Sequence, residues 1–135
     1  MVTVVKDDPV GFRKTSNSLA GVPFEFQWVV VDGSGDSAIF DLLADNTAAA
    51  HTKYVYQKPC GIYAAMNEGL AHSSRKYIMF LNAGDVLLTS EANIKLLDEI
   101  EQEQPLWSSS PVLFERHSKL PKIMGDVNFQ VEFER

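Results

Sequence analysis

One stretch, residues 76–85 (KYIMFLNAGD), constrains the fold of this chain more than any other. Its apolar run, residues 77–81, lacks helical spacing and stops abruptly at the turn-like residues 82–85. A short apolar run bounded by a charge and a glycine turn is typical of a strand buried on both faces. Because open α/β sheets bind ligands just past the C-terminal ends of such strands, Asp85 is predicted to lie at a functional edge.

The rest of the chain alternates between strand-like and helix-like segments. Strands are predicted over residues 1–5, 26–31 and 53–56, and helices over residues 9–19, 38–43, 62–70 and 91–104, the last with Ser90 as its N-cap. After Pro105 the pattern changes: residues 107–114 are strand-like around Pro111, and residues 127–133 alternate between apolar and polar side chains. This order predicts an α/β fold, a doubly wound and mostly parallel sheet with antiparallel C-terminal strands.

Composition limits the class of protein and of partner. With 135 residues, 45% of them apolar and 22% charged, the chain is expected to form a single domain over residues 1–135. The net charge of −6 and the scattered basic residues argue against a nucleic-acid partner. The lone Cys60 indicates a reducing compartment, so a cytoplasmic location is expected. No transmembrane segment or signal peptide is predicted.

The tips of all four predicted parallel strands are polar. They are residues 6–8 (KDD), 32–34 (DGS), 57–58 (QK) and 82–85 (NAGD). Loops are often polar merely because they are exposed, but here three of the four tips carry carboxylates. Several carboxylates on one edge repel one another unless a cation is present, so a hard divalent ion shared with ligand phosphates is expected.

Two other motif interpretations fit less well. Asp32, Ser34 and Asp36 occupy the first, third and fifth positions of a calcium loop, but Ser37 and Leu43 stand where that loop needs glycine and glutamate. A dinucleotide fingerprint is absent after the first strand.

Three ordered segments resemble motifs of the family 2 inverting glycosyltransferases, which have the GT-A fold. They are residues 28–33 (WVVVDG), 61–69 (GIYAAMNEG) and 77–85 (YIMFLNAGD), and residues 3–9 (TVVKDDP) match the first strand and helix start of the family. The resemblance covers about residues 2–100, so these would form the donor-binding βα units and residues 101–135 an antiparallel extension.

The resemblance implies a nucleoside-diphosphate sugar such as a UDP-sugar, a divalent metal (Mg²⁺ or Mn²⁺), and transfer to a saccharide or lipid-linked acceptor in polysaccharide biosynthesis. Asp85 would bind the metal as the surviving acid of the D-x-D-type element, with Asn82 in the place of the first acid, and Asp32 would contact the nucleoside. The full set of expected donor-binding residues is Lys6, Asp7, Asp32, Gln57, Tyr63, Asn67 and Asn82.

The chain also departs from the family pattern. Residues 57–60 (QKPC) replace the usual Glu-Pro-Asp-Lys, Ala64 replaces an aspartate, and Arg75 replaces a helix-ending glycine, where a left-handed residue is expected. Family members continue past this length, and their later part supplies the acceptor site and the general base. The acceptor half is therefore expected to be missing, and Asp126 is the candidate for the base.

Two functions remain open from the sequence. The first is an inverting glycosyltransferase domain. The second is a catalytically inactive or partial domain that binds nucleotide or protein, including a homodimer through residues 127–133 if they form a sheet edge. An unrelated nucleotide-binding α/β domain would need a phosphate loop that the sequence does not show.

Overall fold

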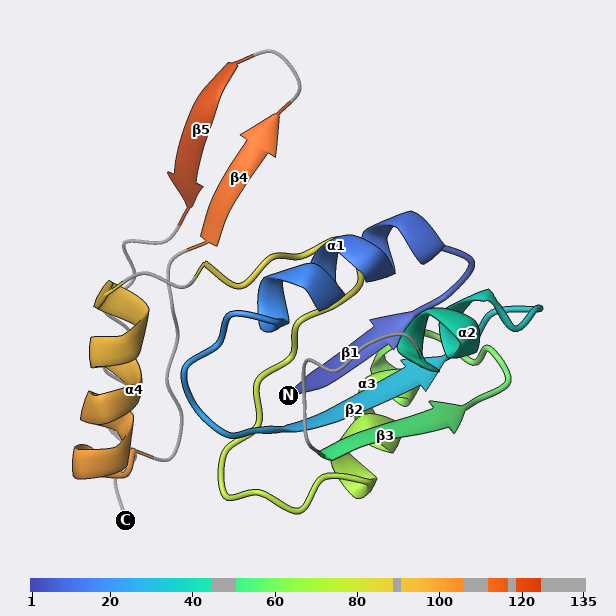
Figure 1. The fold of residues 1–135 in the computed structure, drawn as a ribbon, viewed down its shortest axis with the longest axis horizontal. Coiled ribbons are helices and arrows are strands. Elements are labelled where there is room, and N and C mark those ends of the chain that lie inside the picture. Colours follow the sequence, from blue (N-terminus) through green and yellow to red (C-terminus); the bar gives the residue numbers. More distant parts are fainter. Residues whose placement is uncertain (45–50, 89–90, 106–111, 117–118, 125–135) are drawn as a thin grey trace. The chain divides into compact units, whose positions relative to one another are not determined.

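The computed structural model describes residues 1–44, 51–88, 91–105, 112–116 and 119–124 (Figure 1). The chain divides into two compact units, Met1–Ile94 and Lys95–Arg135. The first unit is an α/β layer structure, and all of the polar strand tips predicted from the sequence belong to it.

The first unit is built on a parallel sheet of three strands, β1 (Val2–Val5), β2 (Gln27–Asp32) and β3 (His51–Tyr56), in the order β1-β2-β3. Figure 1 shows the three arrows pointing the same way. In the register, Asp32 lies opposite Val5 on one side and opposite Tyr56 on the other. The C-terminal ends of all three strands therefore meet at one edge, as the sequence predicts. Among the described residues this sheet has three strands, where the sequence predicts four.

The predicted central strand lies beside β1, on the side away from β2. Val2 forms a parallel bridge with Phe80, the Val2 N–H donates to the Met79 oxygen at 2.8 Å, and the Ala83 N–H donates to the Val4 oxygen at 3.1 Å. The prediction that this segment is buried on both faces is wrong, because Met79 and Phe80 are 37% and 43% exposed. Among the described residues no strand pairs with its outer edge, so these side chains lack neighbours there.

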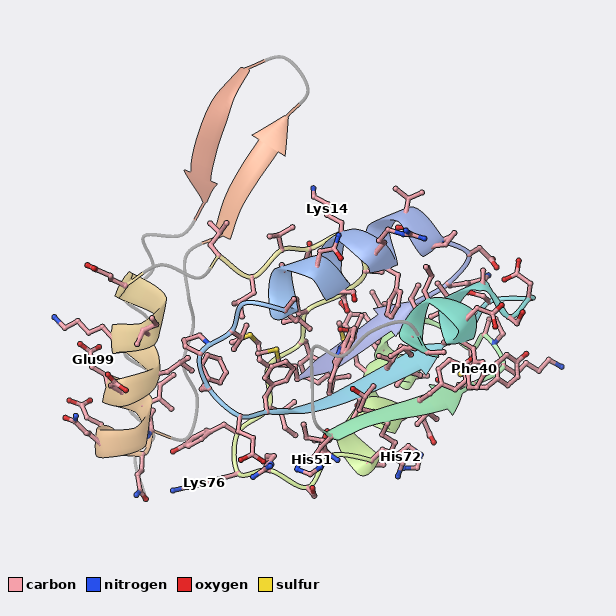
Figure 2. The ribbon with its side chains drawn as sticks, viewed as in Figure 1. Lys14, Phe40, His51, His72, Lys76 and Glu99 are labelled. Atoms are coloured by element: carbon pink, nitrogen blue, oxygen red, sulfur yellow. The ribbon has the colours of Figure 1, made fainter. Side chains whose placement is uncertain are left out.

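Helices cover both faces of the sheet. On one face α1 (Pro9–Leu19) and α2 (Ala38–Ala44) bury a core that contains Phe12, Ile39 and Trp28. The Phe12 and Trp28 rings stack at 5.6 Å, while the Trp28 Nε1–H donates to Thr3 Oγ1 at 2.9 Å. Lys14 points away from this core (Figure 2). The predicted helix 9–19 is confirmed with its cap: Asp8 Oδ1 accepts the Gly11 N–H at 2.8 Å.

On the other face α3 (Ile62–Ala71) packs against Val2, Val29 and Val31 through Ala65 and Gly69. Gly69 is buried, and a Cβ at this position would fall 2.3 Å from Val2 Cγ1. Glycine therefore lets the helix approach the sheet more closely than any other residue would allow.

The end of α3 differs from the prediction. Its C-cap is His72, with an ordinary φ of −95°, and among the described non-glycine residues only Asp7 and Gln104 have positive φ. The expectation that Arg75 is left-handed is therefore wrong, because the helix has already ended before it. The Arg75 guanidinium donates to Glu25 Oε1 at 2.9 Å.

Helix α4 (Glu91–Glu103) crosses the division between the two units, and β4 (Val112–Arg116) pairs antiparallel with β5 (Lys119–Met124) in the second. The predicted strand of residues 107–114 overlaps β4, whereas no strand was predicted over β5. The Ser90 cap, residues 107–111 and the alternating residues 127–133 lie outside the described residues. None of the described helices is both long and apolar enough to cross a membrane.

Candidate functional site at the C-terminal edge of the sheet

Asp32 ends β2 and is wholly buried, with 0% of its surface exposed. Its Oδ1 accepts the Ser34 N–H at 2.8 Å, and its Oδ2 accepts the Tyr54 hydroxyl at 2.8 Å. Burial is the largest cause that raises the pKa of Tyr54 to about 12, and the hydrogen bond to this carboxylate is the second. The Asp32 side chain therefore organises the edge, and a ligand would reach its oxygens only if the Ser34 loop moved.

The loop after β1 is tied to the loop after β2. The Asp7 N–H donates to Ser34 Oγ at 2.9 Å, and Asp7 Oδ1 accepts the Gly35 N–H at 3.3 Å. Asp7 has a φ of +52°, a conformation in which aspartate is enriched among non-glycine residues. These contacts fix the polar loop at the first strand tip next to the buried carboxylate.

Lys6 and Gln57 flank Gly33 at the same edge. A Cβ on Gly33 would lie 3.5 Å from the Gln57 backbone oxygen and 3.8 Å from Lys6 Cγ. The Gln57 N–H in turn donates to the Asp32 backbone oxygen at 2.9 Å. The structure thus brings four predicted site residues together from three strands: Lys6, Asp7, Asp32 and Gln57.

Residues 82–85 form a tight turn beyond the β1 edge. The Asp85 N–H donates to the Asn82 oxygen at 3.0 Å, and Gly84, with φ +95°, occupies the third position of the turn. A type II turn requires a positive φ at that position. The Thr15 hydroxyl of α1 contacts three backbone groups of this turn.

The donor set of this turn suits a hard cation. Asp85 is exposed, and Asn82 Oδ1 is buried without a hydrogen-bond partner. Within the described ranges, no three His, Cys, Asp or Glu side chains are grouped to hold a metal ion. The residues therefore fit an ion bound by one carboxylate and completed by ligand phosphates and water, as is usual for Mg²⁺. They do not fit an ion enclosed by protein ligands alone.

The other predicted residues are less constrained. Tyr63 and Asn67 lie on α3, where both are exposed, Tyr63 by 79%. The structure therefore leaves them accessible without joining them to the network around Asp32. Asp126, the candidate base, lies outside the described residues. Figure 2 shows His51 at the beginning of β3 and Phe40 beside its end, so His51 is remote from the candidate site.

Sequence reasoning missed two residues that hold the site, Tyr54 and Thr15. Tyr54 lies two residues before the end of β3, and a phenol is long enough to reach Asp32, which lies opposite Tyr56. Thr15 is a hydroxyl residue on the buried face of an amphipathic helix, a position at which a polar group needs a partner. A polar residue among the apolar positions of the helix was the feature of the sequence that could have identified Thr15.

No protein-family model and no curated protein matches this sequence. A solved structure does match: S. aureus TarS, a glycosyltransferase, aligns with a TM-score of 0.66 and 18% sequence identity. The fold is glycosyltransferase-like. The alignment covers 76% of this chain and 19% of TarS, so the chain spans about a fifth of the length of that protein.

Proposed function

We propose that this chain binds a nucleoside-diphosphate sugar with Mg²⁺ or Mn²⁺ and transfers the sugar, with inversion, to an acceptor hydroxyl, as a family 2 glycosyltransferase of the GT-A class. The observation that carries the proposal is the network of four site residues at the C-terminal edge of a glycosyltransferase-like fold. Ligands of open α/β sheets bind in this position.

The charges of the edge suit a diphosphate. Lys6 is exposed at the first strand tip, and its ammonium group can pair with a phosphate. The exposed Asp85 carboxylate is negative, so it can lie near a phosphate only when a metal cation is bound between them. Asp7 and Asp32 hold the loops after β1 and β2, whose exposed backbone groups would face the nucleoside. Gln57 adds an amide at the third tip.

A metal held by the exposed Asp85 would neutralise the diphosphate leaving group when bound, and Asn82 of the same turn is the proposed second ligand, through an oxygen that has no other partner. The exposed Tyr63 and Asn67 of α3 are the proposed contacts for the sugar end of the donor. Inversion requires the acceptor hydroxyl to attack the anomeric carbon directly, with a base taking its proton. Asp126 remains the proposed base, and a saccharide or lipid-linked alcohol the proposed acceptor.

The first test is a calorimetric titration of the purified chain with UDP and then GDP, each with and without Mn²⁺. The proposal expects one nucleotide to bind, and to bind more tightly with Mn²⁺. Asp85→Ala should remove the Mn²⁺ enhancement, because the only carboxylate of the turn is lost. Asp98→Ala, an exposed aspartate on α4, is the matched control and should bind as the wild type does. Failure of both nucleotides to bind would refute the proposal.

A second candidate is a domain that binds nucleotide without transferring sugar. It is favoured by Ala64, since the first turn of α3 carries no acidic residue where the resemblance expects one. Incubating the chain with a labelled sugar donor separates the two functions. Metal-dependent binding without sugar release or transfer would support the second candidate, whereas turnover would exclude it.

A further inference from the structure

Thr15 connects α1 to the turn of residues 82–85, across about seventy residues of sequence. Its side chain is wholly buried, with 0% exposed. Its hydroxyl donates to the Asp85 backbone oxygen at 2.7 Å, with the Asn82 oxygen further away at 3.2 Å, and it accepts the Gly84 N–H at 3.0 Å. A threonine hydroxyl has one hydrogen and two acceptor lone pairs, so this one hydroxyl satisfies both a donor and an acceptor of the turn.

A second hydroxyl, one turn further along α1, extends the same connection. Ser18 Oγ accepts the Leu87 N–H at 3.1 Å and donates to the Thr15 backbone oxygen at 2.7 Å. The later part of the turn and the residues after it are thus held by side chains of α1, whereas the backbone bonds to β1 extend only as far as Ala83, the second residue of the turn. The direction of the Asp85 backbone depends on α1.

We propose that Thr15 is a positioning residue for the donor site: it fixes the turn so that the Asp85 carboxylate faces the diphosphate. This inference rests on the proposed function. It adds a residue that touches neither nucleotide nor metal and acts through the backbone of the turn. Thr15 therefore controls the metal-dependent part of donor binding, while the loops around Asp32 control the part that needs no metal.

Thr15→Val tests this directly, because valine keeps the shape of threonine and removes the hydroxyl. Both hydrogen-bonding groups of the turn then lose their partner. Thr15→Ser restores the hydroxyl. Thr3→Val is the matched control: Thr3 is equally buried at 0% exposure, and its hydroxyl bonds to Trp28 in the core, with no contact to the turn.

The nucleotide that binds wild type is titrated into each variant with and without Mn²⁺, after circular dichroism has shown that each is folded. Thr15→Val should weaken binding with Mn²⁺ by about tenfold and change binding without Mn²⁺ by less than about twofold. Thr15→Ser should recover most of the Mn²⁺ enhancement, and Thr3→Val should retain it. Full enhancement in Thr15→Val, or an equal loss in Thr3→Val, would overturn the inference.

Gly84→Ala provides a second route if Thr15→Val does not fold. Gly84 has φ +95° with nothing within 4 Å of its would-be Cβ, so alanine strains the turn without a clash in the core. The same selective loss of Mn²⁺ enhancement is expected, and its retention would show that the turn geometry does not matter. If wild type binds neither UDP nor GDP, the proposed function fails first and the inference falls with it. If wild type binds and the variants keep the enhancement, only the inference fails.

Discussion

Replacing Tyr54 with phenylalanine removes the hydroxyl that donates to Asp32 Oδ2 at 2.8 Å and leaves this carboxylate oxygen without that partner. Asp32 is 0% exposed, so water cannot take the place of the hydroxyl unless the loop opens. Hydrogen bonds to charged groups contribute about 1.5–3 kcal/mol, and an unsatisfied buried acceptor costs a similar amount. The free energy of unfolding should fall by about 2 kcal/mol, which lowers the Tm of a domain of this size by about 6–10 °C.

Thermal and urea unfolding followed by circular dichroism measure this loss. Tyr56→Phe is the control, because Tyr56 lies on the same strand but is 60% exposed. Its replacement should change stability by less than about 0.5 kcal/mol, as is usual for surface substitutions. Equal stabilities of Tyr54→Phe and Tyr56→Phe would refute the view that the hydrogen bond between Tyr54 and Asp32 organises the edge of the sheet.

The same pair predicts a dependence on alkaline pH. Burial, followed by the bond to Asp32, raises the pKa of Tyr54 from 10.0 to about 12. Because the pKa is higher in the folded state, the stabilisation is fully present below pH 10 and is lost as the pH rises through about 12. Absorbance of tyrosinate should show a step near pH 12, and Tyr54→Phe should remove that step. A late step that persists in the variant would belong to another residue.

Two further substitutions test the packing and the end of α3. Gly69→Ala would place a Cβ 2.3 Å from Val2 Cγ1; overpacking of about 1–3 kcal/mol outweighs a helix-propensity gain of about 1 kcal/mol, so urea unfolding should show a net loss. Gly21→Ala, with nothing within 4 Å, is its control, and equal stabilities would contradict the close approach of α3 to the sheet. Arg75→Gly should not stabilise the chain, because Arg75 has no positive φ and only its exposed ion pair with Glu25 is lost. A measurable gain in Tm would mean that Arg75 is strained after all.

Local sequence signals predicted the elements that are stabilised locally. The Asp8–Pro9 start of α1 is visible in the sequence, because a capping oxygen followed by proline satisfies the first turn from within the segment itself. The continuous apolar run of β2 likewise predicts a strand with both faces covered, and its residues from Trp28 to Asp32 are all buried.

The same rule failed for residues 77–81. Apolar composition shows that a segment can be buried, but the number of elements that pack against it depends on its position in the sheet. These residues lie at the edge beside β1, and Tyr77, Met79 and Phe80 remain 37–43% exposed. The expected left-handed conformation of Arg75 is wrong for a different reason: α3 already ends at Ala71, so Arg75 is not the residue that ends the helix.

The order of the residues is enough to show which side chains are available at the functional edge. Polar side chains after apolar strands must lie at the strand ends, and parallel connections place those ends together, so Lys6, Asp7, Asp32 and Gln57 could be grouped in advance. What each side chain does there depends on tertiary packing. It buried Asp32 against Tyr54 and tied Asp85 to Thr15, two contacts over 22 and 70 residues of sequence. Such pairs depend on how helices and strands pack, which no local pattern encodes.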